Sequence, residues 1–99
     1  MTPRPKHPKP DANQADIIAG LETLGFVVWN TSPLGGQVLD LVVFGRGMAL
    51  PVEVKQPGLE GDLTDAERES IERLRAVGVD AVVATCAEDV VEKFNTETP

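Results

Sequence analysis

Two residue types that commonly build metal centres and cross-links are scarce in this chain of 99 residues. Cys86 is the only cysteine, and His7 is the only histidine. A single cysteine cannot form an intrachain disulfide, which is consistent with a reducing cytoplasm. Because His7 lies in a proline-rich segment, we do not expect a zinc site built from histidine and cysteine.

Long apolar runs are also missing. No stretch approaches the roughly 18 apolar residues that a membrane span requires. The opening segment MTPRPKHPKP carries basic residues without the apolar region of a secretory signal. We therefore expect no membrane partner and a cytoplasmic location.

Positive charge is in short supply, since the net charge is −7. Proteins that coat nucleic acid without sequence preference depend on Lys and Arg, so this charge argues against that class. It leaves room for a nuclease, whose metal site requires carboxylates. Residues 1–10 hold four prolines and three of the nine basic residues, which predicts a disordered basic tail. This tail is either a phosphate-seeking arm or a solvated terminus.

The remaining residues, 11–99, are long enough for one domain. Apolar spacing and capping residues predict a helix from Asp11 to Leu24 with Gln14 in its capping box, a second helix at 64–77, and a short last helix. Strands are predicted at 26–30, 38–44, 48–55 and 80–85. The fold class is therefore α/β, in the order α-β-β-β-α-β-α, with a mixed four-stranded sheet flanked by helices. The apolar last strand is expected to be central, and Pro51 indicates an edge or a bulge in the third strand.

Two acidic residues are expected to meet across the hairpin of the second and third strands. A two-residue turn at positions 46 and 47 pairs Asp40 with Glu53. A four-residue loop gives the same pairing, whereas a three-residue loop shifts it by one. Like charges directly opposite one another repel. A chain that keeps both acids at these positions is expected to bind a cation between them.

Lys55 lies on the same face of the strand, one pleat beyond Glu53. Oxygen ligands favour Mg²⁺ or Mn²⁺, and an ammonium group beside such an ion could steady an attacking water or the charge developing on phosphorus. This arrangement predicts a phosphodiesterase site; the alternative is a surface cluster in which Lys55 neutralises both acids. Gln14 either binds a metal-bound water or only closes its helix. Glu67 either supplies a further acid or only caps the second helix.

The string Asp40-x12-Glu53-Val54-Lys55, with a helix and a strand on each side, resembles the PD-(D/E)xK nuclease signature. The chain is more closely similar to the small stand-alone phage and bacterial domains of the virus-type replication–repair nucleases (VRR-NUC). This similarity is carried by DANQADIIAGLETLGFVV, the two-glycine loop before LDLVVF, VEVK, LTDAE and LRAVGVDAVVATCAEDVVE.

The resemblance implies a restriction-endonuclease-like core and hydrolysis of DNA backbone bonds with Mg²⁺ or Mn²⁺. Asp40, Glu53 and the Val54 carbonyl would be metal ligands. Lys55 would be the catalytic lysine. Residues 11–99 would form the nuclease domain, acting as a homodimer similar to Holliday junction resolvases in a bacterial or phage-infected cell.

The chain departs from the family pattern at Leu39, where the family has proline, and at Glu67, where it often has glutamine. The expected partner is branched DNA, with Arg46, Lys6 and Lys9 as phosphate contacts. Two alternatives stay open. The same chemistry could act on flap or nicked duplex DNA, or the fold could serve as a non-catalytic binding or assembly module.

Overall fold

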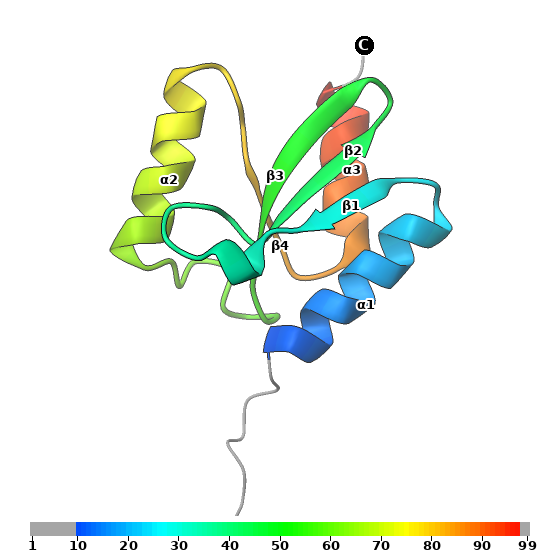
Figure 1. The fold of residues 1–99 in the computed structure, drawn as a ribbon, viewed down its shortest axis with the longest axis horizontal. Coiled ribbons are helices and arrows are strands. Elements are labelled where there is room, and N and C mark those ends of the chain that lie inside the picture. The colour runs from blue at the N-terminus through cyan, green and yellow to red at the C-terminus, as the bar shows by residue number, and fades with distance from the viewer. Residues whose placement is uncertain (1–9, 98–99) are drawn as a thin grey trace, which may run out of the picture.

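Four strands form one mixed sheet in the order β1-β2-β3-β4 (Figure 1). The computed structural model describes residues 10–97. Neighbouring strands are antiparallel except for β3 and β4, which run parallel. The elements are α1 (Pro10–Thr23), β1 (Val27–Asn30), η1 (Ser32–Leu34), β2 (Leu41–Gly45), β3 (Met48–Val54), α2 (Asp65–Ala76), β4 (Val82–Ala84) and α3 (Ala87–Glu97).

The α/β class and the mixed sheet confirm the prediction, but the order of elements differs in one respect. The segment after β1, predicted as a loop, contains the short 3₁₀ helix η1. Pro33 lies at the start of η1, where its fixed φ suits a helix and its missing N–H is not needed. None of the helices within residues 10–97 has the length and apolar character of a membrane crossing.

The β2–β3 hairpin has the register that its turn predicts. Both turn residues have positive φ, 53° and 76°, as a two-residue turn of this hand requires. The observed pairs run from Gly45–Met48 at the turn to Leu41–Val52 at the far end. Continuing this ladder by one residue places Asp40 opposite Glu53.

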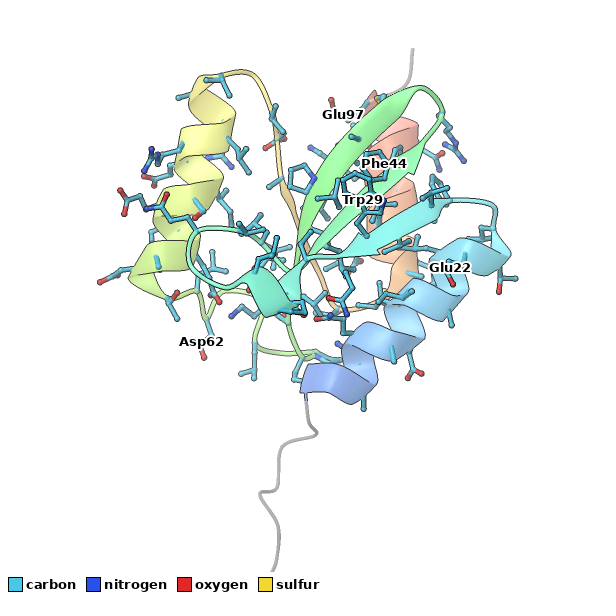
Figure 2. All side chains as sticks on the ribbon, in the orientation of Figure 1. Glu22, Trp29, Phe44, Asp62 and Glu97 are labelled. Atoms are coloured by element: carbon cyan, nitrogen blue, oxygen red, sulfur yellow. The ribbon has the colours of Figure 1, made fainter. Side chains whose placement is uncertain are left out.

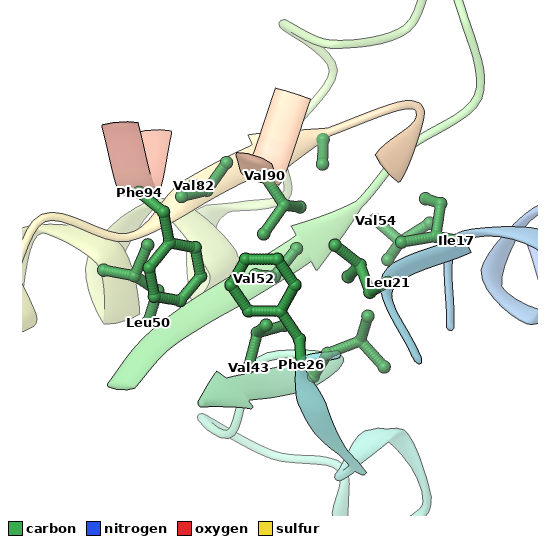
Figure 3. Packing of buried hydrophobic residues seen from close by; sticks show 12 residues of the cluster. Ile17, Leu21, Phe26, Val43, Leu50, Val52, Val54, Val82, Val90 and Phe94 are labelled. Carbon is green, nitrogen blue, oxygen red and sulfur yellow. The ribbon is translucent and has the colours of Figure 1, made fainter. Parts of the chain in front are cut away.

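Helices α1 and α3 cover one face of the sheet (Figure 3). Leu21 of α1 and Phe94 of α3 are fully buried in one cluster with Val43 and Val52 of the central strands. Phe26, between α1 and β1, packs on Phe94 with ring centroids 4.7 Å apart. The hydrophobic core therefore lies on this side of the sheet.

Helix α2 stands over part of the opposite face (Figure 1). Its N-terminus has the predicted capping box: Thr64 Oγ1 accepts from the Glu67 N–H, and the Glu67 carboxylate accepts from the Thr64 N–H. Ser70 Oγ donates to the Gln37 carbonyl at 2.9 Å and joins α2 to the loop before β2. A cavity of about 310 Å³ remains between α2 and the sheet. The rest of this face is open, and Trp29 lies there (Figure 2).

The predicted placement of two strands within the sheet was wrong. β4 lies at an edge, not at the centre. Val82 and Ala84 are apolar because they face the helices of the core, not because strands flank β4 on both sides. β3 is internal although it contains Pro51. The β3–β4 ladder begins only at the next residue, Val52, so β4 needs no N–H from the proline.

Element boundaries also differ from the prediction. β2 begins at Leu41 instead of residue 38, which leaves Asp40 just before the strand. α1 begins at Pro10, so Asp11 lies within the helix and the predicted cap at Asp11 was wrong. Residue 10 therefore belongs to α1 and not to the tail. The predicted disorder of the tail concerns residues 1–9, which lie outside the described residues.

Candidate functional site

Asp40 lies where β2 and β3 separate. The Thr31 N–H and hydroxyl donate to the carbonyls of Asp40 and Leu39, at 2.9 and 2.6 Å, and draw this segment toward β1. Asp40 Oδ2 accepts from the Val54 N–H of β3 at 2.9 Å. The carboxylate thus replaces a strand carbonyl as hydrogen-bond partner at the point where the sheet opens.

Glu53 and Lys55 extend from the same face of β3, as the alternation of a strand requires. Glu53 is only 5% exposed. Lys55 Nζ lies 2.8 Å from Glu67 Oε1 of α2 and 3.9 Å from Glu53 Oε2. The lysine therefore pairs mainly with Glu67, and the charge of a fully ionised Glu53 would be poorly compensated.

The surroundings of Glu53 favour its protonated form. Burial raises its pKa to about 8, and the hydrogen bond with Glu67 and the nearby Asp40 charge act in the same direction. Burial also opposes ionisation of Glu67, but hydrogen bonds from Lys55 Nζ and the Thr64 N–H outweigh it and lower that pKa to about 2. Protonated Glu53 thus donates a hydrogen bond to ionised Glu67.

The backbone of Lys55 is held on both sides. Its N–H donates to the Ala84 carbonyl of β4 at 2.9 Å. Its carbonyl accepts from Asn13 Nδ2 of α1 at 2.9 Å. Sequence reasoning missed Asn13, because it lies 42 positions from Lys55 and no local pattern marks the contact.

Gln14 is buried, and so lies inward as predicted. Its amide nitrogen donates to Asn30 Oδ1 at 2.9 Å and to Ser32 Oγ at 3.2 Å. These bonds tie α1 to the segment after β1, and they occupy the donor that could have faced a metal-bound water. A role for Gln14 at the metal site stays a prediction.

The oxygen atoms of Asp40 and Glu53 are suitable ligands for a hard divalent ion, because such ions prefer carboxylates. The N–H and C=O of one strand residue point to the same side. The Val54 carbonyl therefore faces the side of β3 on which Asp40 binds the Val54 N–H. Within residues 10–97 no group of three or more His, Cys, Asp or Glu side chains is arranged to hold a metal ion. Water and phosphate oxygens would have to complete the coordination, as is common for Mg²⁺.

The predicted phosphate contacts do not gather at this site. Arg46 lies at the hairpin turn, and the length of β2 separates it from Asp40 by about 20 Å. Its guanidinium donates to Asn95 and lies over the Phe26 ring, 5.7 Å from the centroid. Lys6 and Lys9 fall outside the described residues.

Comparisons with known protein families, with curated proteins and with solved structures found no match to this chain. The similarity to the VRR-NUC domains therefore stays a prediction from the sequence. The function proposed below depends on the geometry around Asp40, Glu53 and Lys55.

Proposed function

We propose that this chain is a metal-dependent DNA endonuclease with a restriction-endonuclease-like core of the VRR-NUC type. The observation that carries the proposal is the buried carboxyl group of Glu53. It lies near Asp40, while Lys55 pairs more closely with Glu67. A buried acid is costly to ionise when its nearest cation, here Lys55 Nζ at 3.9 Å, is paired more closely with another acid. A divalent ion between Glu53 and Asp40 would remove that cost.

Asp40, Glu53 and the Val54 carbonyl would hold this ion, and their oxygen atoms favour Mg²⁺ or Mn²⁺. When bound, the ion would polarise the phosphoryl group and lower the pKa of an attacking water. Glu53 must lose its proton to act as a ligand. Binding of the ion is therefore coupled to release of a proton.

Lys55 would act on the phosphate or on the attacking water. Burial opposes its charge, but the hydrogen bond to Glu67 outweighs this effect and raises the pKa of the ammonium group. Lys55 therefore stays charged, and its fixed backbone limits where the ammonium group can reach. Such a fixed charge stabilises the negative charge that develops on phosphorus. Glu67 acts through Lys55 and is a positioning residue.

A homodimer with twofold symmetry would present two such sites side by side. This arrangement suits a four-way junction, in which two strands must be cut. We therefore propose branched DNA as the substrate, with the Holliday junction first and flap or nicked duplex DNA as the alternatives.

Cleavage of synthetic junctions, flaps, nicked duplexes and linear duplexes in Mg²⁺ tests this proposal and ranks the substrates. We expect metal-dependent cleavage of branched DNA that falls by about 100-fold or more in Asp40→Asn and in Lys55→Ala. Glu60→Gln, which alters an exposed acid in the loop before α2, should cleave like the wild type. Cleavage that persists in Lys55→Ala and in the presence of a chelator would refute the assignment.

One observation favours a non-catalytic binding or assembly module. Asp40 already accepts from the Val54 N–H, and the Lys55–Glu67 pair is satisfied within the protein. No buried side-chain N or O atom within residues 10–97 lacks a hydrogen-bond partner. A purely structural network would give no change in melting temperature on addition of Mg²⁺ or Mn²⁺, whereas an ion site would raise it.

A further inference from the structure

Trp29 is the only tryptophan in the chain, and its side chain is 60% exposed. Phe44 packs against it edge-on, with ring centroids 4.7 Å apart and an interplanar angle of 63° (Figure 2). This contact fixes the orientation of the indole ring and leaves much of it open to solvent. An exposed ring of fixed orientation is a platform on which another planar ring can stack.

Trp29 lies on the same sheet face as the candidate site. It pairs with Val42 of β2, and Val42 comes two residues after Asp40. The rise along a strand and the spacing between strands place the Cα atoms of Trp29 and Asp40 about 8 Å apart. A nucleotide whose phosphate lies at the two acids can therefore bring a neighbouring base to the indole ring.

The cavity beside α2 continues this surface. Its volume is about 310 Å³, and Val42, Pro51 and Leu74 are among its apolar lining residues. Arg73 and Gln37 add polar groups to the lining. Apolar walls with a few hydrogen-bonding groups suit a planar heterocycle better than a phosphate.

Few Lys and Arg side chains on the described part of the protein are available to bind phosphate. Each Lys and Arg side chain within residues 10–97 is already engaged by polar groups of the chain, so few can neutralise phosphates without breaking a contact. Contacts to the bases would have to supply much of the affinity. The pairs are Arg46 with Asn95, Lys55 with Glu67, Arg68 with the Leu63 carbonyl, Arg73 with Glu69 and Gln37, Arg75 with Asp80, and Lys93 with Asp80 and Glu97.

We infer that Trp29 and the adjoining cavity bind unpaired bases next to the phosphate that is cut. This inference rests on the proposed function and names its substrate class: DNA with unpaired nucleotides at the cleavage site, not continuous duplex. In a duplex the bases are stacked on one another and do not reach the indole ring. A second copy of the chain is the rival occupant, since exposed apolar residues also mark subunit interfaces.

Fluorescence of the full-length protein tests the inference, because the chain has no other tryptophan and no tyrosine. Metal-free protein is titrated with oligothymidylate and with a blunt hairpin duplex that has the same number of phosphates. We expect oligothymidylate to quench the emission of Trp29 and to bind about tenfold more tightly than the duplex.

Variants separate stacking from a general effect of exposed apolar groups. Trp29→Ala should weaken oligothymidylate binding about tenfold, measured by anisotropy of a labelled oligonucleotide, and Trp29→Phe should restore most of it. Leu24→Ala removes another apolar side chain, 61% exposed, and should bind like the wild type. Equal binding of the two DNAs, or unchanged binding by Trp29→Ala, would overturn the inference. If sedimentation shows that Trp29→Ala dissociates a dimer, the inference is also overturned, and this face is assigned to contact with a second copy of the chain.

Failure of this inference is separable from failure of the proposed function. If Mg²⁺-dependent cleavage is equally fast on continuous duplex and in Trp29→Ala, the endonuclease stands and the requirement for unpaired bases is refuted. If no DNA is cut but oligothymidylate still quenches Trp29, the nuclease is refuted and the binding of unpaired bases is supported.

Discussion

Replacing Glu53 by glutamine removes a buried acid while keeping the shape of its side chain. In the native protein the pKa of Glu53 is raised from 4.5 to about 8 by burial, by the hydrogen bond with Glu67 and by Asp40. Between these two pH values the unfolded chain releases a proton that the native state retains. The free energy of unfolding of the metal-free protein must therefore fall as pH rises through this window.

The size of the effect follows from the same two pKa values. One proton gives a slope of at most about 1.4 kcal/mol per pH unit, which bounds the total near 5 kcal/mol. Water that enters around an ionised carboxylate lowers this penalty. We therefore expect a loss of about 1–3 kcal/mol between pH 5 and 8. Glu67 acts in a separate window, because its lowered pKa makes its contribution disappear only as pH falls from 4.5 to about 2.

Urea unfolding followed by circular dichroism, in a chelator and at a series of pH values, measures this loss. The free energy of unfolding of Glu53→Gln should change little between pH 5 and 8, whereas that of the wild type falls. At pH 8 the variant should be more stable than the wild type by about 1–3 kcal/mol. Glu60→Gln, a matched change at an exposed acid, should follow the wild type. The same pH dependence in wild type and Glu53→Gln would refute the argument that Glu53 is protonated in the metal-free protein.

Three further changes test other parts of the structure. Asp40→Asn keeps an oxygen that accepts from the Val54 N–H but removes a negative charge near Glu53. The melting temperature of the metal-free protein should therefore be unchanged or higher. The rise in melting temperature that Mn²⁺ causes in the wild type should be lost. Glu67→Gln can still cap α2. The pKa of Glu53, followed by NMR titration, should fall because Lys55 becomes free to pair with Glu53. An unchanged pKa of Glu53 would argue against the Glu67 contact. Leu21→Ala, at a fully buried position of the core, should lower the free energy of unfolding in urea by about 2–5 kcal/mol, and a loss below 1 kcal/mol would contradict the packing.

Local chemistry made several parts of the fold predictable. The turn at positions 46 and 47 fixes the pairing of β2 with β3, because a two-residue turn leaves one register. The capping box from Thr64 to Glu67 marks the start of α2 for the same reason: its hydrogen bonds join residues three positions apart. Both features depend only on neighbours in the sequence.

The features that sequence reasoning missed depend on distant parts of the chain. The apolar residues of β4 show that helices cover it, but they do not tell whether a strand lies on each side. The hydrogen bond from Asn13 to the Lys55 carbonyl joins residues with no shared pattern. The cap of α2 was predictable, yet the bond from Lys55 Nζ to the same Glu67 oxygen depends on where α2 lands over the sheet.

Mn²⁺ binding tests most directly the central claim that Asp40 and Glu53 share a divalent ion. The free ion is counted by electron paramagnetic resonance during titration of the wild type, Asp40→Asn, Glu53→Gln and the exposed control Glu60→Gln. We predict saturable binding by the wild type and by Glu60→Gln, tighter at pH 8 than at pH 6, and loss of binding in the other two variants. Equal binding by all of these proteins, or none by the wild type, would contradict the claim.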